Sequence, residues 1–163
     1  MELVVLGIGS NEGDSSAILS GAVKRLRGIL TDLRVAPIFK TAPQGVADQP
    51  PFLNTAVCGF CTLTPQELLA TVHRIEAAFG RDRTRERRWG ERTLDIDILL
   101  FGQRVLSSRS LEIPHPRLRE RTFALVPLLA LLPKAADPCT GEPYAHILER
   151  LPDQNVKPLD CLE

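Results

Sequence analysis

The sequence predicts an α+β fold, a ferredoxin-like sandwich with the element order βαββαβ and a C-terminal elaboration. Two observations predict it. Short apolar runs have the length and composition of strands, and two amphipathic stretches with a helical period lie between them. The chain has 163 residues without a linker, an internal repeat or a low-complexity segment, so we expect residues 1–163 to form one domain.

The first half of the chain supplies a strand, a helix and a second strand. Residues 2–8 form a continuous apolar run, which is typical of a central strand. Apolar residues at helical spacing predict a helix over 16–30. Residues 33–40 predict the next strand, and three prolines and one glycine exclude regular structure in the segment 41–51.

The second half begins with a strand predicted over residues 53–62. The next helix opens with Thr64-Pro65-Gln66-Glu67, a capping-box pattern with proline at the first helical position, and Gly80 ends it. Residues 93–101 predict the fourth strand. Beyond it we expect a small turn or ribbon, a short helix over 123–132 and an irregular tail.

Composition and charge limit the classes of protein to which the chain can belong. The chain is 44% hydrophobic and 25% charged, which is typical of a folded domain. Lys+Arg and Asp+Glu balance at 20 each, so no net charge attracts nucleic acid or a membrane surface. The apolar segment 123–132 is too short to cross a membrane, and residues 1–6 carry no basic leader. We therefore expect a cytoplasmic protein, and no obligate protein partner is evident.

Asp95 and Asp97 lie two residues apart in the fourth predicted strand, so they should face the same side of the sheet. Two adjacent carboxylates on a largely apolar strand repel each other and lose hydration, and a divalent cation can offset both costs. Magnesium suits the pair because it typically takes one or two carboxylates and leaves other positions to water and phosphates. The alternative is a strand face with both carboxylates in water.

The loop before this strand is rich in arginine. Six arginines lie within residues 81–92, and twelve of the sixteen arginines lie within residues 74–121. Guanidinium groups bind phosphate oxygens in a bidentate manner, so the loop and the two aspartates together favour a small polyanionic ligand. A solvated charged loop is the alternative. Trp89-Gly90 near the end of the loop indicates that it could close over a ligand.

Other common sites are not supported. The chain has no G-x-x-x-x-G-K-[ST] loop, and Gly7, Gly9 and Gly13 do not have the spacing of a dinucleotide-binding fingerprint. Cys58 and Cys61 have the spacing of a redox or zinc site. Residues three apart on a strand point to opposite faces, however, so we expect both cysteines to be small buried hydrophobic groups.

Several motifs occur in the order in which one known family has them. Residues 88–99, with the sequence Arg-Trp-Gly-Glu-Arg-Thr-Leu-Asp-Ile-Asp-Ile-Leu, resemble the signature of the hydroxymethyl-dihydropterin pyrophosphokinases of folate biosynthesis. The resemblance covers nearly the whole chain. Its other parts are Gly9-Ser10-Asn11, Thr41 to Gly45, Asp48-Gln49-Pro50, Phe52-Leu53-Asn54, Arg74-Ile75-Glu76, Gly80-Arg81, Pro114-His115-Pro116 and Arg121-Thr122-Phe123.

The resemblance implies the transfer of pyrophosphate from ATP to the hydroxymethyl group of 6-hydroxymethyl-7,8-dihydropterin, with release of AMP. Asp95 and Asp97 would bind two Mg²⁺ ions that bridge the ATP phosphates, and Arg81 and Arg92 would be catalytic residues that stabilise the transferring group. The implied ATP-binding residues are Glu76, Arg83, Arg88, Ile98, Leu111, Glu112, His115 and Arg121. The implied pterin-binding residues are Thr41, Ala42, Gln44, Phe52, Asn54 and Phe123, and Trp89 would belong to a lid.

The chain departs from the pattern of this family at a few positions. Glu91 stands where the signature usually has proline, and Phe52 stands where a tyrosine is usual, which keeps the ring face and loses a hydroxyl. The stretch from Gly80 to Trp89 is one residue longer than in the form we compare it with. It therefore stays open which arginines of this stretch contact phosphate.

Two other functions fit part of the sequence. An RNA-binding module can have the same βαββαβ order, but the chain has only eight aromatic residues and no glycine-aromatic motif on its central strands. A magnesium-dependent nucleotidyl or phosphoryl transferase with another acceptor would use the same aspartates and arginines. Only the segment 41–54 and Phe123 argue for a pterin, and no general base is apparent.

Overall fold

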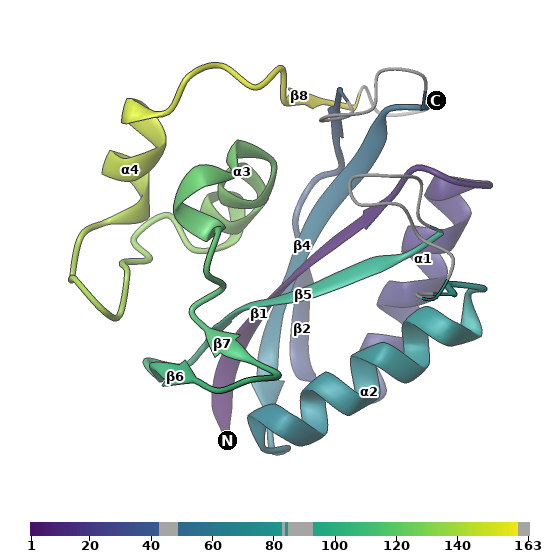
Figure 1. The fold of residues 1–163 in the computed structure, drawn as a ribbon, viewed down its shortest axis with the longest axis horizontal. Helices are drawn as coiled ribbons and strands as arrows, with labels where there is room; N and C mark the ends of the chain where they lie inside the picture. The colour runs from purple at the N-terminus through teal and green to yellow at the C-terminus, as the bar shows by residue number, and fades with distance from the viewer. Residues whose placement is uncertain (43–48, 83, 85–92, 160–163) are drawn as a thin grey trace.

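The computed structural model describes residues 1–42, 49–82, 84 and 93–159 (Figure 1). In this part of the chain six strands form an antiparallel sheet with the order β5-β1-β4-β3-β8, and β2 also pairs with β4. The bounds of these strands are β1 Glu2–Ser10, β2 Thr31–Val35, β3 Phe39–Thr41, β4 Phe52–Cys61, β5 Asp95–Phe101 and β8 Lys157–Pro158. A separate hairpin consists of β6 Leu106–Ser107 and β7 Glu112–Ile113.

Helices cover both faces of the sheet. Their bounds are α1 Ser15–Leu26, α2 Pro65–Ala78, α3 Thr122–Leu131 and α4 Tyr144–Arg150, and a 3-10 turn spans Leu118–Glu120. Figure 1 shows α1 and α2 on one side of the sheet and α3 and α4 on the other. The fold is therefore a mixed α/β arrangement with an antiparallel sheet between two helical layers.

Alternate residues of β1 supply two different hydrophobic cores. Val4, Leu6 and Ile8 belong to the core under α1 and α2, and Val5 belongs to the core under α3 and α4. Because helices cover both faces, β1 needs apolar side chains at successive positions rather than at alternate ones. The continuous apolar run in the sequence has this cause, and the prediction of a central strand is confirmed.

The capping box predicted for the second helix is confirmed. The Thr64 hydroxyl accepts a hydrogen bond from the Glu67 N–H at 3.2 Å, and the Glu67 carboxylate accepts one from the Thr64 N–H at 2.8 Å. These bonds satisfy two groups that would otherwise lack partners at the helix terminus. The helix ends near Gly80, which has a φ of +90° that suits glycine.

The prediction of one strand over residues 33–40 is wrong, because β2 and β3 are separate. Pro37 lies between them and has no N–H to donate to a strand ladder. At this break the Thr55 hydroxyl of β4 donates to the Ala36 carbonyl at 2.9 Å. The first helix is also shorter than predicted, since it ends at Leu26 and tight turns carry the chain to Leu30.

The tail predicted to be irregular contains α4 and β8. A helix of seven residues and a strand of two are too short to leave a periodic pattern in a sequence. Tertiary contacts stabilise them instead: Tyr144 and Ile147 of α4 pack into the core under α3, and β8 pairs with β3.

The two cysteines of the Cys58-x-x-Cys61 pattern lie in different cores. Cys58 packs on the α3 side of β4 and Cys61 packs on the α1 side, and both are free and buried. The prediction that the two thiols do not share a site is therefore confirmed. In the described ranges no helix combines the length and the apolar character needed to span a bilayer.

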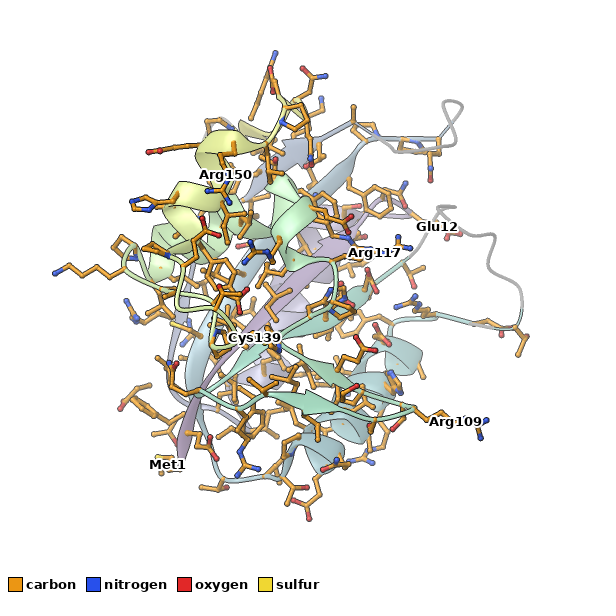
Figure 2. The ribbon with its side chains drawn as sticks, turned by 60° about the vertical axis from the view of Figure 1, so that its left-hand side comes forward. Met1, Glu12, Arg109, Arg117, Cys139 and Arg150 are labelled. Carbon is orange, nitrogen blue, oxygen red and sulfur yellow. The ribbon has the colours of Figure 1, made fainter. Side chains whose placement is uncertain are left out.

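Two arginines of the segment 74–121, Arg109 and Arg119, have different surroundings. Arg109 lies at the turn between β6 and β7 and projects away from the molecule, as expected for a solvated side chain (Figure 2). Arg119 instead donates to Asp137 at 2.7 Å and to Glu142 at 2.9 Å. Glu142 also accepts from Arg150 at 2.6 Å, so this network joins the 3-10 turn to α4.

We expect Asp137→Asn to lower the free energy of unfolding by about 2 kcal/mol at neutral pH, because it weakens a charged hydrogen bond to a buried side chain. Asp137 is 3% exposed. Burial opposes its ionisation, but hydrogen bonds from Cys139 N–H and Arg119 outweigh burial and hold the pKa of Asp137 below its usual range. Urea denaturation measures the loss, with Glu149→Gln on the exposed side of α4 as a control.

The lowered pKa of Asp137 also determines how its contribution to the free energy of unfolding varies with pH. This part of the stability is present above about pH 4, the unfolded-state pKa, and is lost as the pH falls through the lower folded-state pKa. The difference between wild type and Asp137→Asn should therefore shrink from about pH 7 to about pH 3. A difference that stays constant would contradict the assignment.

Candidate functional site

Asp95 and Asp97 lie on the α3 side of β5. Ile96 and Ile98, which alternate with them, pack into the core on the opposite side. The two aspartates therefore share one face of the sheet, as their spacing predicts. Their side chains are 32% and 31% exposed, so the carboxylates remain accessible from this face.

Two glycines of β1 lie directly opposite the aspartates, Gly9 opposite Asp95 and Gly7 opposite Asp97. On the next strand Asn54 lies opposite Gly9, and a Cβ atom at Gly9 would be only 2.7 Å from Asn54 Oδ1. The missing side chains leave a pocket lined by Asp95, Asp97, Gly7, Gly9, Asn54 and Phe123, among others. From the sequence, Gly7 and Gly9 were expected neither to form a dinucleotide fingerprint nor to open a pocket, although Gly9 belongs to a motif of the family resemblance. Their spacing of two within a strand was the signal for this role.

Asn54 has a fixed orientation in the pocket. Its Nδ2 donates to the Thr41 hydroxyl of β3 at 2.9 Å, and both residues are buried. Phe52 lies two residues before Asn54 on β4, is half-buried and does not line this pocket. Ala42 follows β3 and is exposed. Thr41 and Asn54, both expected among the pterin-binding residues, are thus in direct contact.

A buried ion pair between Arg81 and Glu76 holds the Asp95 carboxylate in place. Arg81 Nη1 lies 2.8 Å from Asp95 Oδ1 and 2.5 Å from Glu76 Oε2, and the same Glu76 oxygen accepts from the Ile96 N–H at 2.8 Å. The side chains of Arg81 and Glu76 are 5% and 2% exposed. The last turn of α2 is therefore bonded to the start of β5. Glu76, expected among the nucleotide contacts, is instead buried in this bridge, which no sequence motif indicated.

Two cationic or polar groups face Asp97. His115 Nε2 lies 3.8 Å from Asp97 Oδ1, and Arg121 Nη1 lies 3.6 Å from Asp97 Oδ2. The Arg121 guanidinium also lies over the ring of Phe123, with 5.5 Å between its carbon and the ring centroid. Arg121 thus connects the aspartates to the aromatic wall of the pocket.

The orientation of His115 follows from its second ring nitrogen. His115 Nδ1 accepts a hydrogen bond from the Arg117 N–H at 3.1 Å, so the neutral ring carries its proton on Nε2, which faces Asp97. Burial, and then the charge of Arg121, lower the pKa of His115 to about 4. His115 is therefore a neutral hydrogen-bond donor toward this site at neutral pH.

Among the described residues, the positive charges near Asp95 and Asp97 do not offset the repulsion between the two carboxylates. Desolvation by the surrounding protein, and then the charge of Asp95, raise the pKa of Asp97 to about 7 although Arg121 and Arg81 lower it. A divalent cation would relieve this repulsion. Within the described ranges no three His, Cys, Asp or Glu side chains cluster closely enough to enclose a metal. Two carboxylates completed by water and phosphate oxygens match the preference of Mg²⁺.

The other expected nucleotide contacts lie apart from the aspartate face or outside the described residues. Ile98 and Leu111 are buried in the core under α1 and α2, and Glu112 of β7 is exposed. The expected site residues that lie outside the described ranges are Gln44, Arg83, Arg88, Trp89 and Arg92.

The chain is similar to known proteins both in fold and in sequence. Among solved structures, Plasmodium falciparum HPPK-DHPS with pteroate superimposes with a TM-score of 0.71 at 13% identity, which shows similarity of fold. The match covers 91% of this chain and 42% of that one, so the chain spans less than half of that protein.

Sequence relatives are closer. The 2-amino-4-hydroxy-6-hydroxymethyldihydropteridine pyrophosphokinase of Methylorubrum extorquens is 42% identical over 160 residues, which cover 96% of this chain and 98% of that protein. The protein of the same name from Aquifex aeolicus is 34% identical over 163 residues, covering 99% and 98%. Residues 5–133 match the family model, and they include both aspartates, the glycines opposite them, Asn54, His115, Arg121 and Phe123. The chain therefore belongs to the 7,8-dihydro-6-hydroxymethylpterin-pyrophosphokinase (HPPK) family.

Proposed function

We propose that this protein transfers pyrophosphate from ATP to the hydroxymethyl group of 6-hydroxymethyl-7,8-dihydropterin and releases AMP, as a step of folate biosynthesis. The observation that carries the proposal is the pair Asp95 and Asp97 beside Arg121, on the same face of the sheet as Asn54 and Phe123. Membership of the HPPK family and the relatives named as pyrophosphokinases support the same reaction.

Asp95 and Asp97 would hold two Mg²⁺ ions together with the ATP phosphates. The fit rests on the accessible oxygen ligands and on the uncompensated charge that raises the pKa of Asp97. Bound Mg²⁺ would neutralise the charge of the triphosphate and favour attack at phosphorus. His115 and Arg121 would contact the same phosphates, His115 as a neutral donor and Arg121 as a fixed positive charge.

Arg81 would act mainly by holding Asp95. The resemblance to the family implied a contact with the transferring group, but a side chain that is 5% exposed and bonded to Asp95 and Glu76 fits a positioning role better. Glu76 would serve the same purpose, since its carboxylate is bonded to Arg81 and to the backbone of β5. Both residues would set the angle at which Asp95 meets its ligand.

The pterin would bind over the two glycines of β1, where no side chain blocks a flat ring. Thr41 takes one hydrogen-bonding position of the Asn54 amide, so the remaining positions can bind the polar edge of the pterin. Phe123 supplies a ring face on one side, and Phe52 would supply the other. Ala42 would line the same end of the pocket near the end of β3.

The chain itself supplies alignment rather than a nucleophile. The substrate hydroxyl would attack the β-phosphorus, the bond between that phosphorus and the oxygen of AMP would break, and the hydroxyl proton would pass to water or phosphate. Such a reaction depends mostly on orientation and charge neutralisation. This accounts for a site whose described residues include arginine, histidine and two aspartates but no reactive serine or cysteine.

We also propose a fold class and a domain organisation for the chain. The pairing of β5 with β1, β1 with β4, and β4 with β2 and β3 supports a ferredoxin-like sandwich, which we propose as a single domain over residues 1–163. A cytoplasmic location, and the absence of nucleic-acid, membrane and obligate protein partners, stay predictions from the sequence.

The reaction is tested by incubating the protein with ATP, Mg²⁺ and 6-hydroxymethyl-7,8-dihydropterin. We expect AMP rather than ADP, and a fall in rate on the order of 10³-fold or more for Asp97→Ala, because the metal loses one of its protein ligands. Asp32→Asn, at an exposed position of β2 away from the aspartate pair, should keep the wild-type rate. ADP as the product would favour another phosphoryl transfer, and substantial turnover by Asp97→Ala would refute the metal assignment.

The buried bridge is tested by stability. Glu76→Gln should lower the free energy of unfolding by about 3 kcal/mol, because it removes a charge from a buried ion pair. The double variant Glu76→Gln/Arg81→Met should lose less than the sum of the single variants, since each residue compensates the other. Urea denaturation measures both values. Additive losses would show that Arg81 and Glu76 stabilise the fold independently.

A further inference from the structure

The residue directly before α3 has an extended backbone and lies where a helix usually has a capping side chain. Arg121 is the N-cap of α3, and no side chain within its own turn caps the helix. An arginine has no acceptor atom, so it cannot accept from the first N–H groups of the helix as Ser, Thr, Asp or Asn would. Its guanidinium instead faces Asp97 and covers Phe123.

Gln154 supplies what Arg121 cannot. Its Oε1 accepts from the Thr122 N–H at 3.0 Å, and its Nε2 donates to the Glu120 carbonyl at 2.9 Å. One carboxamide thus bonds to the backbone on both sides of Arg121. This arrangement fixes the two peptide planes that flank Arg121, the residue whose side chain faces Asp97.

The segment that carries Gln154 is itself held at both ends. It follows α4, which packs against α3, and it leads into β8, which pairs with β3. The Leu159 N–H also donates to the Ile38 carbonyl at 2.9 Å. The segment lies beyond residues 5–133, the part of the chain that matches the family model. Sequence motifs of the family therefore gave no indication of it.

We propose that Gln154 is a positioning residue for the reaction, which acts by holding the backbone around Arg121 and thereby the guanidinium that faces Asp97. The inference rests on the proposed function, because Arg121 and Phe123 are assigned there to ATP and pterin. Displacement of a catalytic group by about 1 Å can reduce a rate by about 10²-fold, so a backbone clamp of this kind has a measurable effect.

The test compares three substitutions in the full-length protein. Gln154→Leu removes both hydrogen bonds and should lower kcat/KM for ATP and for the pterin by about tenfold. Gln154→Glu keeps an acceptor for the Thr122 N–H and should recover part of this loss. Gln66→Leu makes the same change on the exposed side of α2 and should have no effect. All three should remain fully folded under the assay conditions, as urea titrations verify, so that a lower rate reflects position and not loss of folded protein.

A double variant identifies the path of the effect. If Gln154 acts through Arg121, Gln154→Leu should cost about twofold or less in an Arg121→Ala background, where the positioned group is already absent. A full tenfold loss in that background, or wild-type kcat/KM for Gln154→Leu alone, would overturn the inference.

Hydrogen exchange at the Thr122 amide gives a readout that does not depend on the reaction. Gln154→Leu should accelerate this exchange, and Gln154→Glu should accelerate it less, because only the latter retains the acceptor. Absence of AMP formation by the wild-type protein would refute the proposed function alone. Unchanged exchange in Gln154→Leu would refute the clamp alone.

Discussion

The repulsion between two carboxylates on one strand face is the constraint around which the site is built. Asp95 and Asp97 sit at the end of an otherwise apolar strand, and the charge of Asp97 is only partly offset by its neighbours. Arg81 and Glu76 fix the first carboxylate from behind, and Arg121 and His115 face the second from the front. Each support comes from a different element, so the site exists only when α2, β5 and the start of α3 are in place.

One face of the sheet forms a hydrophobic core, and the other forms a second core and the pocket. The face under α1 and α2 is a closed hydrophobic core that continues from β1 to β5. On the face under α3 and α4, Val5 and Leu100 are buried, whereas the layer opens at Gly7 and Gly9, where no side chains fill it. A binding pocket therefore arises from the omission of side chains within a strand, and the hydrophobic core on the opposite face holds that strand in place.

Local signals in the sequence predicted much of this arrangement. The capping box at Thr64, the apolar run of β1 and the alternation around Asp95 each depend on a few neighbouring residues, and the structure bears them out. The unforeseen features depend on partners far away in the chain. The burial of Glu76 and the contacts of Gln154 are determined by residues 20 and 32 positions distant. No periodic pattern or motif encodes such contacts.

The alternation along β1 has a consequence for how variation in this strand would be tolerated. Val4, Leu6 and Ile8 support the α1 and α2 layer, whereas Gly7 and Gly9 border the pocket. In a saturation library of this strand, harmful changes at the former should reduce cellular abundance, and harmful changes at the latter should leave folded but inactive protein. The two classes of defect would interleave residue by residue, so a screen for growth alone would merge them and a paired screen for abundance would separate them.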